Sequence, residues 1–322
     1  MNEPVRNTIP PAVTIRDVEQ AAVRIAGRVR RTPMLRAGPV RTHSAAAGLW
    51  FKLENLQVTG SFKARGACNA MAALDPAELA RGVVTASGGN HGLAVAYAAG
   101  AARVPATVYV PASVPLAKRE KLAAWGATVI EAGAVWDDAY ATASAHATAD
   151  GSRPIHPFAD PAVIAGQGTL ALEALDDVPG IDTMLVAIGG GGLISGVAIA
   201  ARARRPGLRV VGVEPVGAAT LHDSLAAGQP VVLDRIATEA GTLAPRSTDA
   251  LNFGIVQALV DRVVLVTDAE MREAARWLWF EHGVATELAG AASVAAVLTG
   301  RYVARPGEVV CAVICGSGVD GF

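Results

Sequence analysis

Apolar residues follow two alternating patterns along the chain: short, nearly continuous runs, and longer stretches in which they recur every three or four positions. The short runs are typical of strands that are buried on both faces of a sheet. They predict strands at 49–53, 82–86, 106–110, 127–131, 183–188, 208–213, 263–267 and 308–314. The longer stretches predict helices at 90–100, 116–125, 135–149, 162–176, 192–204, 268–282 and 289–299. A further helical pattern over 14–29 opens with Thr14 and Asp17, which resemble a capping box.

This alternation favours an α/β protein with open, mostly parallel sheets flanked by helices. Eight strands would make a wide single sheet, and the proline-rich stretch RPIHPFADP at 153–161 interrupts the alternation. We therefore predict two lobes. A large domain is formed by 1–58 and 159–322, and a smaller α/β domain, 59–158, is inserted into it.

The composition narrows the class of protein. The 322 residues carry a formal net charge of -1 and 52% are hydrophobic, so we expect no nucleic-acid or membrane partner. The uncharged stretch 183–201 is nearly long enough to span a bilayer, but four consecutive glycines interrupt it. A strand, a turn and a helix explain it better. The first residues lack an apolar signal segment and the three cysteines are sparse, so we expect a cytoplasmic protein.

Candidate binding residues follow the predicted strands, where open α/β sheets bind their ligands. The run GGGG at 189–192 lies between a strand and a helix, and it suits a phosphate because backbone N–H groups and the helix dipole both face the loop. The spacing matches neither the dinucleotide fingerprint, since Ile194 or Ser195 stands at the third glycine position, nor a P-loop. One glycine would suffice for a tight turn, so four favour a ligand.

Two more loops place polar groups directly after predicted strands. In SGGNHG, 87–92, Ser87, the amides of Gly88 and Gly89, and Asn90 could hold a carboxylate or a ring oxygen, or could form an N-cap with turn glycines. Cys315 follows the last strand and could be a neutral partner for a heterocyclic nitrogen or a small buried hydrophobe.

A lysine, Lys63 in GSFKARGA (60–67), stands where a strand pattern gives way to a helical one. A surface lysine by itself would need no ligand. Together with a phosphate loop, a carboxylate loop and a neutral polar partner, it suits pyridoxal 5'-phosphate, whose aldehyde forms a Schiff base with a lysine. We predict this cofactor, with Lys63 as the Schiff-base lysine.

Five motifs, GSFKARGA, SGGNHG, AVIAGQGT (162–169), GGGGL and CGSGVD, resemble in this order the signature of the fold-type II pyridoxal-phosphate enzymes. More narrowly, they resemble the serine/threonine dehydratase (threonine ammonia-lyase) and serine racemase branch. The resemblance runs from about Thr14 to the C-terminus. It implies a tryptophan synthase β-like fold whose large domain binds the cofactor, and a homodimer or higher homo-oligomer.

The resemblance assigns roles to the loop residues. Lys63 would bind the cofactor, Phe62 would pack against its ring, Asn90 would bond the ring hydroxyl oxygen and Cys315 would face the pyridine nitrogen. The phosphate would be held by Gly189, Gly190, Gly191, Gly192 and Leu193. The substrate carboxylate would be held by Ser87, Gly88, Gly89 and His91. Glu287, in ATELAG, is similar to the family's glutamate before a Pro-Ala-Gly run, with leucine in place of the proline.

The implied reaction is β-elimination of a 3-hydroxy amino acid, L-threonine or L-serine, to a 2-oxo acid and ammonia. Lys63 would be the general base for the Cα proton. A thiol at Cys315 leaves the ring less electron-withdrawing than a carboxylate would, which favours prompt loss of the β-group over transamination. Hydroxide leaves poorly unless protonated, and we expect the phosphate in the glycine loop to supply that proton.

Departures from the family pattern refine this prediction. Racemizing relatives have a second serine, an acid/base on the opposite ligand face, where this chain has Gly88, so elimination is favoured over racemization. The family's divalent-cation site uses a glutamate, here Glu214 in VGVEP, and a downstream acid. Residues 216–221 contain no acid and Thr220 stands near its place, so we expect no divalent metal, while a monovalent cation stays open.

The C-terminal part bears on regulation and substrate. The chain stops at Phe322, so we expect no regulatory domain of the kind that biosynthetic threonine dehydratases add. The segment 238–253 differs from the usual dehydratase pattern and leaves open a specialised substrate such as threo-3-hydroxyaspartate or phenylserine. His156 lies in the connection between the lobes and could be near the site, but we favour a structural role.

Three alternatives remain open. A serine racemase or a β-replacement synthase would share the motifs, and a non-catalytic cofactor carrier would keep the same residues. A nicotinamide oxidoreductase is disfavoured by the failed dinucleotide spacing.

Overall fold

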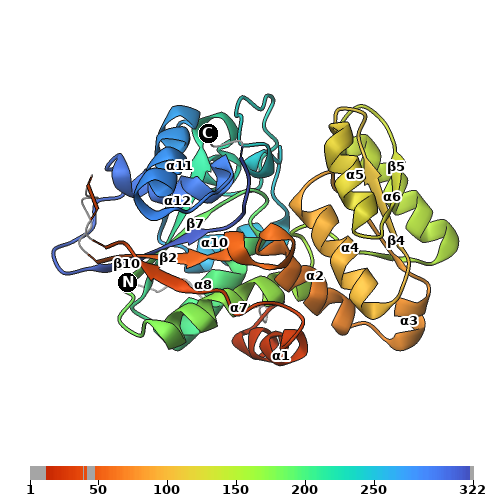
Figure 1. Ribbon diagram of the computed structural model, residues 1–322, viewed down its shortest axis with the longest axis horizontal. Helices are drawn as coiled ribbons and strands as arrows, with labels where there is room; N and C mark the ends of the chain where they lie inside the picture. The colour runs from red at the N-terminus through yellow and green to blue at the C-terminus, as the bar shows by residue number, and fades with distance from the viewer. Residues whose placement is uncertain (1–11, 39, 42–47, 320–322) are drawn as a thin grey trace, which may run out of the picture.

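The computed structural model describes residues 12–38, 40–41 and 48–319, which form two sheets with helices on their faces. Figure 1 shows the sheets side by side, with helix α2 (Lys63–Ala72) between them. The predicted fold class is confirmed.

The larger sheet has six strands in the order β1-β2-β10-β7-β8-β9. These strands are β1 (Met34–Arg36), β2 (Gly48–Leu53), β10 (Val309–Ile314), β7 (Thr183–Ala187), β8 (Arg209–Pro215) and β9 (Arg262–Val266). Each pair is parallel except β1 with β2. Because parallel strands share one carboxyl edge, the loops after β10, β7 and β8 open on the same side of the sheet.

The smaller sheet has four parallel strands in the order β5-β4-β3-β6. These strands are β3 (Val83–Ala86), β4 (Ala106–Val110), β5 (Thr128–Glu131) and β6 (Arg153–Pro154). Successive side chains of β4 point to opposite faces, as the period of a strand requires. Val108 and Val110 join one apolar cluster, and Tyr109 joins another on the opposite face.

Helices cover both faces of both sheets. In the larger part, α11 (Asp268–His282) and α12 (Leu288–Leu298) lie on one side, and α7 (Pro161–Asp177) and α8 (Gly192–Arg204) lie on the other (Figure 1). The strands between them are buried at nearly every position, which is why they read as continuous apolar runs. The smaller sheet packs against α4 (Asn90–Ala102), α5 (Leu116–Ala124) and α6 (Trp136–Asp150). The remaining helices are α1 (Ile15–Ile25), α3 (Pro76–Ala80), α9 (Thr220–Ala227) and α10 (Ala250–Leu259).

Several elements differ from the sequence-based expectations. The helix opened by Thr14 and Asp17, whose carboxylate accepts the Thr14 N–H at 2.8 Å, ends at Ile25 and does not continue to residue 29, because Gly27 turns the chain at φ 75°. Strands β1 and β6 were not predicted, because three-residue and two-residue strands show no periodicity. Helices α3, α9 and α10 were missed as well.

The predicted division of the chain into 1–58 with 159–322 and 59–158 stays a prediction. The strands of the smaller sheet lie within the second range, but α2 packs against both α7 and α4. Within the described residues, no helix is both long and apolar enough to cross a membrane.

Candidate active site

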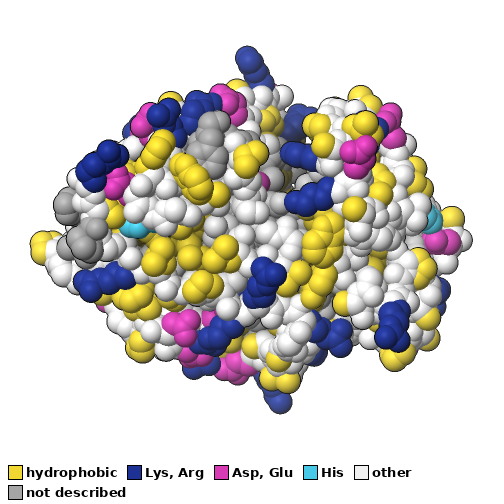
Figure 2. All heavy atoms as spheres, in the orientation of Figure 1, with side chains coloured by type: hydrophobic (Ala, Val, Ile, Leu, Met, Phe, Trp, Pro, Cys, Tyr) yellow, Lys and Arg dark blue, Asp and Glu magenta, His cyan; other side chains and the backbone are white. Residues whose placement is uncertain are grey.

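Three of the loops singled out in the sequence, those with Lys63, Gly189–Gly192 and Cys315, lie at the carboxyl edge of the larger sheet. The fourth follows β3 of the smaller sheet and meets them through the hydrogen bond from Asn90 to Glu287. Cys315 directly follows β10, and its carbonyl oxygen accepts the Phe62 N–H at 3.1 Å. Beside it, Ser61 pairs with Gly316 in an antiparallel bridge. The turn that begins α2 is thereby fixed to the end of the last strand. Figure 2 shows the surface hollowed between the two parts of the molecule, with Lys and Arg side chains on the right-hand rim.

Lys63 is the first residue of α2. Its Nζ donates a 2.7 Å hydrogen bond to the carbonyl oxygen of Pro157 and lies 5.1 Å from the centre of the Phe62 ring. Burial lowers the pKa of Lys63 to about 8, and the neighbouring Cys315 and Glu287 oppose this shift. A substantial fraction of the amine is therefore neutral and nucleophilic near physiological pH.

Three groups from distant parts of the chain surround this amine. Asn90, at the start of α4, donates through Nδ2 to Oε1 of Glu287 at 2.8 Å. A Cβ on Gly316 would overlap the Glu287 carboxylate, so a larger residue there would displace that side chain. Burial raises the pKa of the Cys315 thiol far above its ordinary value, which keeps the sulfur protonated and neutral. Cys315 is thus a weakly polar neighbour of Lys63.

The run Gly189–Gly192, called the glycine cradle below, joins β7 to α8. Gly191 has φ 99°, a left-handed conformation that favours glycine. A Cβ on Gly190 or Gly192 would contact Phe158, and the Gly190 carbonyl oxygen accepts a 3.0 Å hydrogen bond from the Thr248 hydroxyl. Phe158 follows Pro157 directly, so one short segment touches both the cradle and Lys63.

The loop Ser87–His91 follows β3. The Ser87 Oγ accepts the Gly89 N–H at 3.3 Å, as in a turn. A Cβ on Gly88 would overlap the Val114 side chain. His91 is buried, and its Nε2 lies 3.0 Å from the Ile155 carbonyl oxygen. Burial and the nearby Lys63 lower the pKa of His91 to about 3, so the neutral ring donates from Nε2 and leaves Nδ1 as an acceptor.

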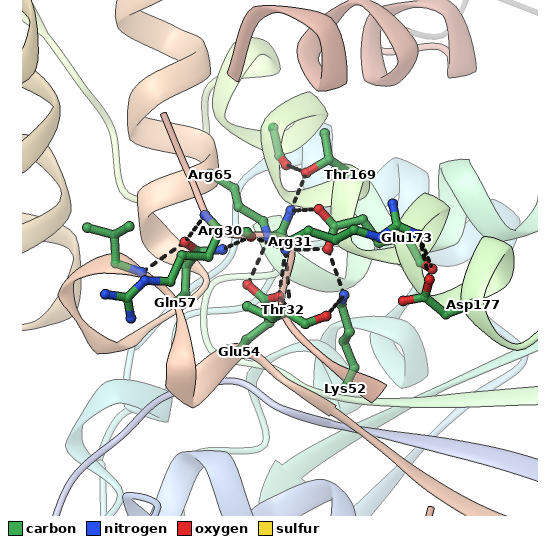
Figure 3. Close-up of polar contacts among 12 residues, drawn as sticks. Arg30, Arg31, Thr32, Lys52, Glu54, Gln57, Arg65, Thr169, Glu173 and Asp177 are labelled. Atoms are coloured by element: carbon green, nitrogen blue, oxygen red, sulfur yellow. Dashed lines mark hydrogen bonds and ion pairs between the residues drawn. The ribbon is translucent and has the colours of Figure 1, made fainter. Parts of the chain in front are cut away.

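A buried charge cluster behind Lys63 was missed in the sequence. The guanidinium of Arg65 is fully buried and pairs with Glu54 through two hydrogen bonds of 2.8 Å, and with Glu173 at 2.7 and 2.8 Å (Figure 3). Lys52 donates to Glu173 at 2.6 Å and to the Thr32 carbonyl oxygen at 2.7 Å. This cluster ties α2 to β2, to the turn after it and to α7. Two of its ion pairs, Lys52 with Glu173 and Arg65 with Glu173, join residues that are more than a hundred positions apart. No spacing in the sequence therefore indicated the cluster.

Glu214, the residue at the family's cation position, accepts hydrogen bonds from the backbone of this chain. Its two carboxylate oxygens accept the N–H groups of Leu221 and His222, each at 2.8 Å, at the start of α9. Burial raises the pKa of Glu214 to about 8. In the part of the chain that the structure describes, no group of three His, Cys, Asp or Glu side chains could hold a metal ion.

The fold and these loops define an α/β enzyme whose site combines a partly buried lysine with a glycine-rich turn at the start of a helix. The chain belongs to the pyridoxal-phosphate dependent enzymes, fold type II, because the model of that family matches residues 25–316. The family and the cofactor predicted from the motifs are confirmed.

Individual relatives are similar over nearly the whole chain. The L-threonine ammonia-lyase of Geobacter sulfurreducens is 40% identical over 303 residues, which cover 94% of this chain and 75% of that protein. The serine racemase of Dictyostelium discoideum is 36% identical over 312 residues, which cover 96% and 95%. The structure of maize serine racemase superposes with a TM-score of 0.89 at 36% identity, covering 96% of this chain and 94% of that one.

The residues present fit the cofactor of this family. Glycine amides at the start of a helix suit a phosphate, and a neutral thiol suits a ring nitrogen that stays unprotonated. A lysine whose amine is partly neutral suits an aldehyde. Ser61 adds a buried hydroxyl that has no hydrogen-bond partner among the described residues.

Proposed function

We propose that this protein is a threonine/serine ammonia-lyase, which converts a 3-hydroxy amino acid into a 2-oxo acid and ammonia. The observation that carries the proposal is the Lys63 amine, held 2.7 Å from the Pro157 carbonyl oxygen beside a neutral thiol, with its pKa lowered to about 8. An amine that changes protonation near neutral pH can act as nucleophile and as general base.

The cofactor is held by residues of four loops. Lys63 would bind the aldehyde, Phe62 would pack beside the ring, Asn90 would contact the ring hydroxyl and Cys315 would face the ring nitrogen. The phosphate would be bound by the amides at the N-terminus of α8, those of Gly189, Gly190, Gly191, Gly192 and Leu193. When bound, pyridoxal phosphate supplies an electron-withdrawing ring that acidifies the Cα–H bond of the substrate.

The chain itself binds the substrate and moves the proton. The amides of the Ser87–Gly89 turn bind the substrate carboxylate, and His91 stands behind that turn as a neutral, buried ring. With its amine free, Lys63 would take the Cα proton of the substrate. Cys315 cannot supply a charge at the ring nitrogen because its thiol stays neutral, which favours rapid loss of the β-hydroxyl.

Racemization is disfavoured by a specific contact. A racemase needs a second acid/base on the ligand face opposite the lysine. Gly88 has no side chain, and Val114 occupies the space that one would need.

The remaining proposals concern the whole molecule. We propose that 1–58 with 159–322 form the cofactor-binding domain and that 59–158 form a smaller domain that carries the substrate loop. We also propose a cytoplasmic homodimer that acts in amino-acid catabolism. Light scattering of the purified protein tests the oligomeric state.

The decisive experiment measures 2-oxo acid release by the purified holoenzyme from L-threonine and L-serine. Release is expected for the wild type and should vanish in Lys63→Ala. Arg31→Ala, which removes an exposed ion pair with Asp177, is the matched control and should leave the rate unchanged. Absence of release by the wild type from every 3-hydroxy amino acid tried would overturn the proposal.

A further inference from the structure

Four ring side chains form a continuous row beside the site. Trp136 and Tyr140, one turn apart on α6, stack with ring centroids 4.9 Å apart and ring planes at 14°. The His156 ring meets Tyr140 edge-on at 5.4 Å and Phe158 edge-on at 4.6 Å. These four residues are called the aromatic row below. The His156 ring joins the two halves of the row.

The aromatic row spans the distance between the two binding loops. At one end, Phe158 packs against the glycine cradle. At the other end, the Trp136 Nε1 donates a 2.9 Å hydrogen bond to the carbonyl oxygen of Ala86, the residue that precedes the substrate loop. Between these ends, His156 adjoins Pro157, which accepts the hydrogen bond from Lys63. A substrate held by the loop and by Lys63 therefore lies next to the row.

The row carries no charge near neutral pH. The His156 Nδ1 accepts the N–H groups of Phe158 and Ala159 at 3.2 and 2.7 Å, so the ring is neutral with its proton on Nε2. Burial lowers the pKa of His156 to about 4, the Asp249 carboxylate opposes this shift and Lys63 adds to it.

Two rings of the aromatic row also have solvent-accessible surface. Trp136 and Tyr140 are 36% and 37% exposed, so both rings keep accessible area after stacking on each other. Such rings attract aromatic and apolar groups, whereas a second carboxylate placed against them would lose hydration without gaining a cationic partner from the row.

We propose that the aromatic row binds the side chain of a 3-hydroxy amino acid with an aromatic group at Cβ, the phenylserine type. The inference rests on the proposed function and names its substrate class. The Cα proton passes to Lys63, and the Cβ–O bond breaks as the hydroxyl takes up a proton and leaves as water. The resulting enamine takes up a proton at Cβ, and one water then replaces the amine. Phenylserine thus gives phenylpyruvate and ammonium, and no oxidant or reductant is consumed.

The test compares kcat/KM of the holoenzyme for L-threo-phenylserine, L-threonine and L-threo-3-hydroxyaspartate. Phenylserine is expected to be preferred over both. Trp136→Leu, which retains apolar volume, and Tyr140→Ala should each lower the ratio for phenylserine over threonine by roughly tenfold, because a ring contact is lost. Calorimetric binding of L-phenylalanine, which has no hydroxyl to lose, should weaken by a similar factor in both variants.

Trp125→Ala is the matched control. Trp125 is also 37% exposed and also meets another ring, Tyr97, but it lies at the far end of α5. This variant should leave the substrate ratio unchanged. Equal or higher kcat/KM for 3-hydroxyaspartate, or an unchanged ratio in both row variants, would overturn the inference while leaving the ammonia-lyase activity standing. Loss of all release, phenylserine included, would instead count against the proposed function.

Discussion

The Nζ of Lys63 lies 2.7 Å from the carbonyl oxygen of Pro157, and the next residue, Phe158, packs against the glycine cradle. One two-residue segment therefore sets the position of the amine relative to the proposed phosphate site. It comes from the connection between the second sheet and α7, which explains how a lysine early in the chain meets a glycine loop more than a hundred residues later.

The first prediction concerns the pH dependence of this amine. Only the neutral form attacks an aldehyde, and with a pKa of about 8 roughly one amine in ten is neutral at pH 7. The rate at which the cofactor-free protein captures pyridoxal phosphate, followed by absorbance, should rise about tenfold per pH unit below pH 8 and level off above it. A rate that keeps rising to pH 10 would mean that burial does not lower the pKa of Lys63.

The contact between Gly88 and Val114 yields a second prediction. Gly88→Ala should lower the free energy of unfolding by about 1–3 kcal/mol, because the added Cβ overlaps Val114 and the core must shift. Gly88→Ala combined with Val114→Ala should recover most of this loss in urea unfolding. Equal losses in the single and double variants would show that Val114 is not the obstacle.

The same pair offers a test of reaction specificity. Gly88→Ser alone should remain a lyase, since the serine side chain has no room. Gly88→Ser with Val114→Ala should form measurable D-serine from L-serine, as chiral chromatography would show. No D-serine from the double variant would place the determinant of racemization elsewhere.

A third prediction addresses Arg65. Arg65→Met removes one of two cations from a cluster that holds two carboxylates, so it should cost about 3–5 kcal/mol of unfolding free energy. Arg65→Met combined with Glu54→Gln should recover part of this cost, because the charge balance is restored. Arg31→Met, at an exposed pair, should cost less than about 1 kcal/mol. Similar losses of unfolding free energy in Arg65→Met and Arg31→Met would mean that burial of an ion pair does not make its disruption more costly.

A fourth prediction links His91 to acid stability. In the unfolded chain its pKa is near 6.5, and in the folded protein it is about 3, so only the unfolded state takes up a proton between these values. The contribution of His91 to the free energy of unfolding is therefore fully present well above pH 6.5, and it is lost progressively as the pH decreases toward 3. Between pH 7.5 and 5.5, His91 should account for about 1.4 kcal/mol of this fall.

The check on His91 is the variant His91→Gln, which keeps a donor for the Ile155 carbonyl oxygen. The unfolding free energies of this variant and of the wild type are measured with denaturant at pH 7.5 and at pH 5.5. The fall between the two pH values should be about 1.4 kcal/mol smaller in the variant. An unchanged pH dependence would indicate that folding does not lower the pKa of His91.

The sequence by itself determined the fold class, the family and the cofactor, because these depend on local patterns. The strand at 106–110 was placed at its observed bounds, and the glycine cradle was found between a strand and a helix. Buried parallel strands are continuously apolar and helix starts carry short motifs, so both are visible within a few residues.

Only the tertiary structure decided which distant side chains meet. Arg65 lies two residues from Lys63, yet nothing local indicates that its partners are Glu54 and Glu173, since a buried ion pair depends on how helices cross. Val114 fills the place of a side chain on Gly88 because of packing between a loop and α4. The aromatic row needs α6 and the 156–158 segment side by side. Such contacts are set by long-range packing, which leaves no period in the sequence.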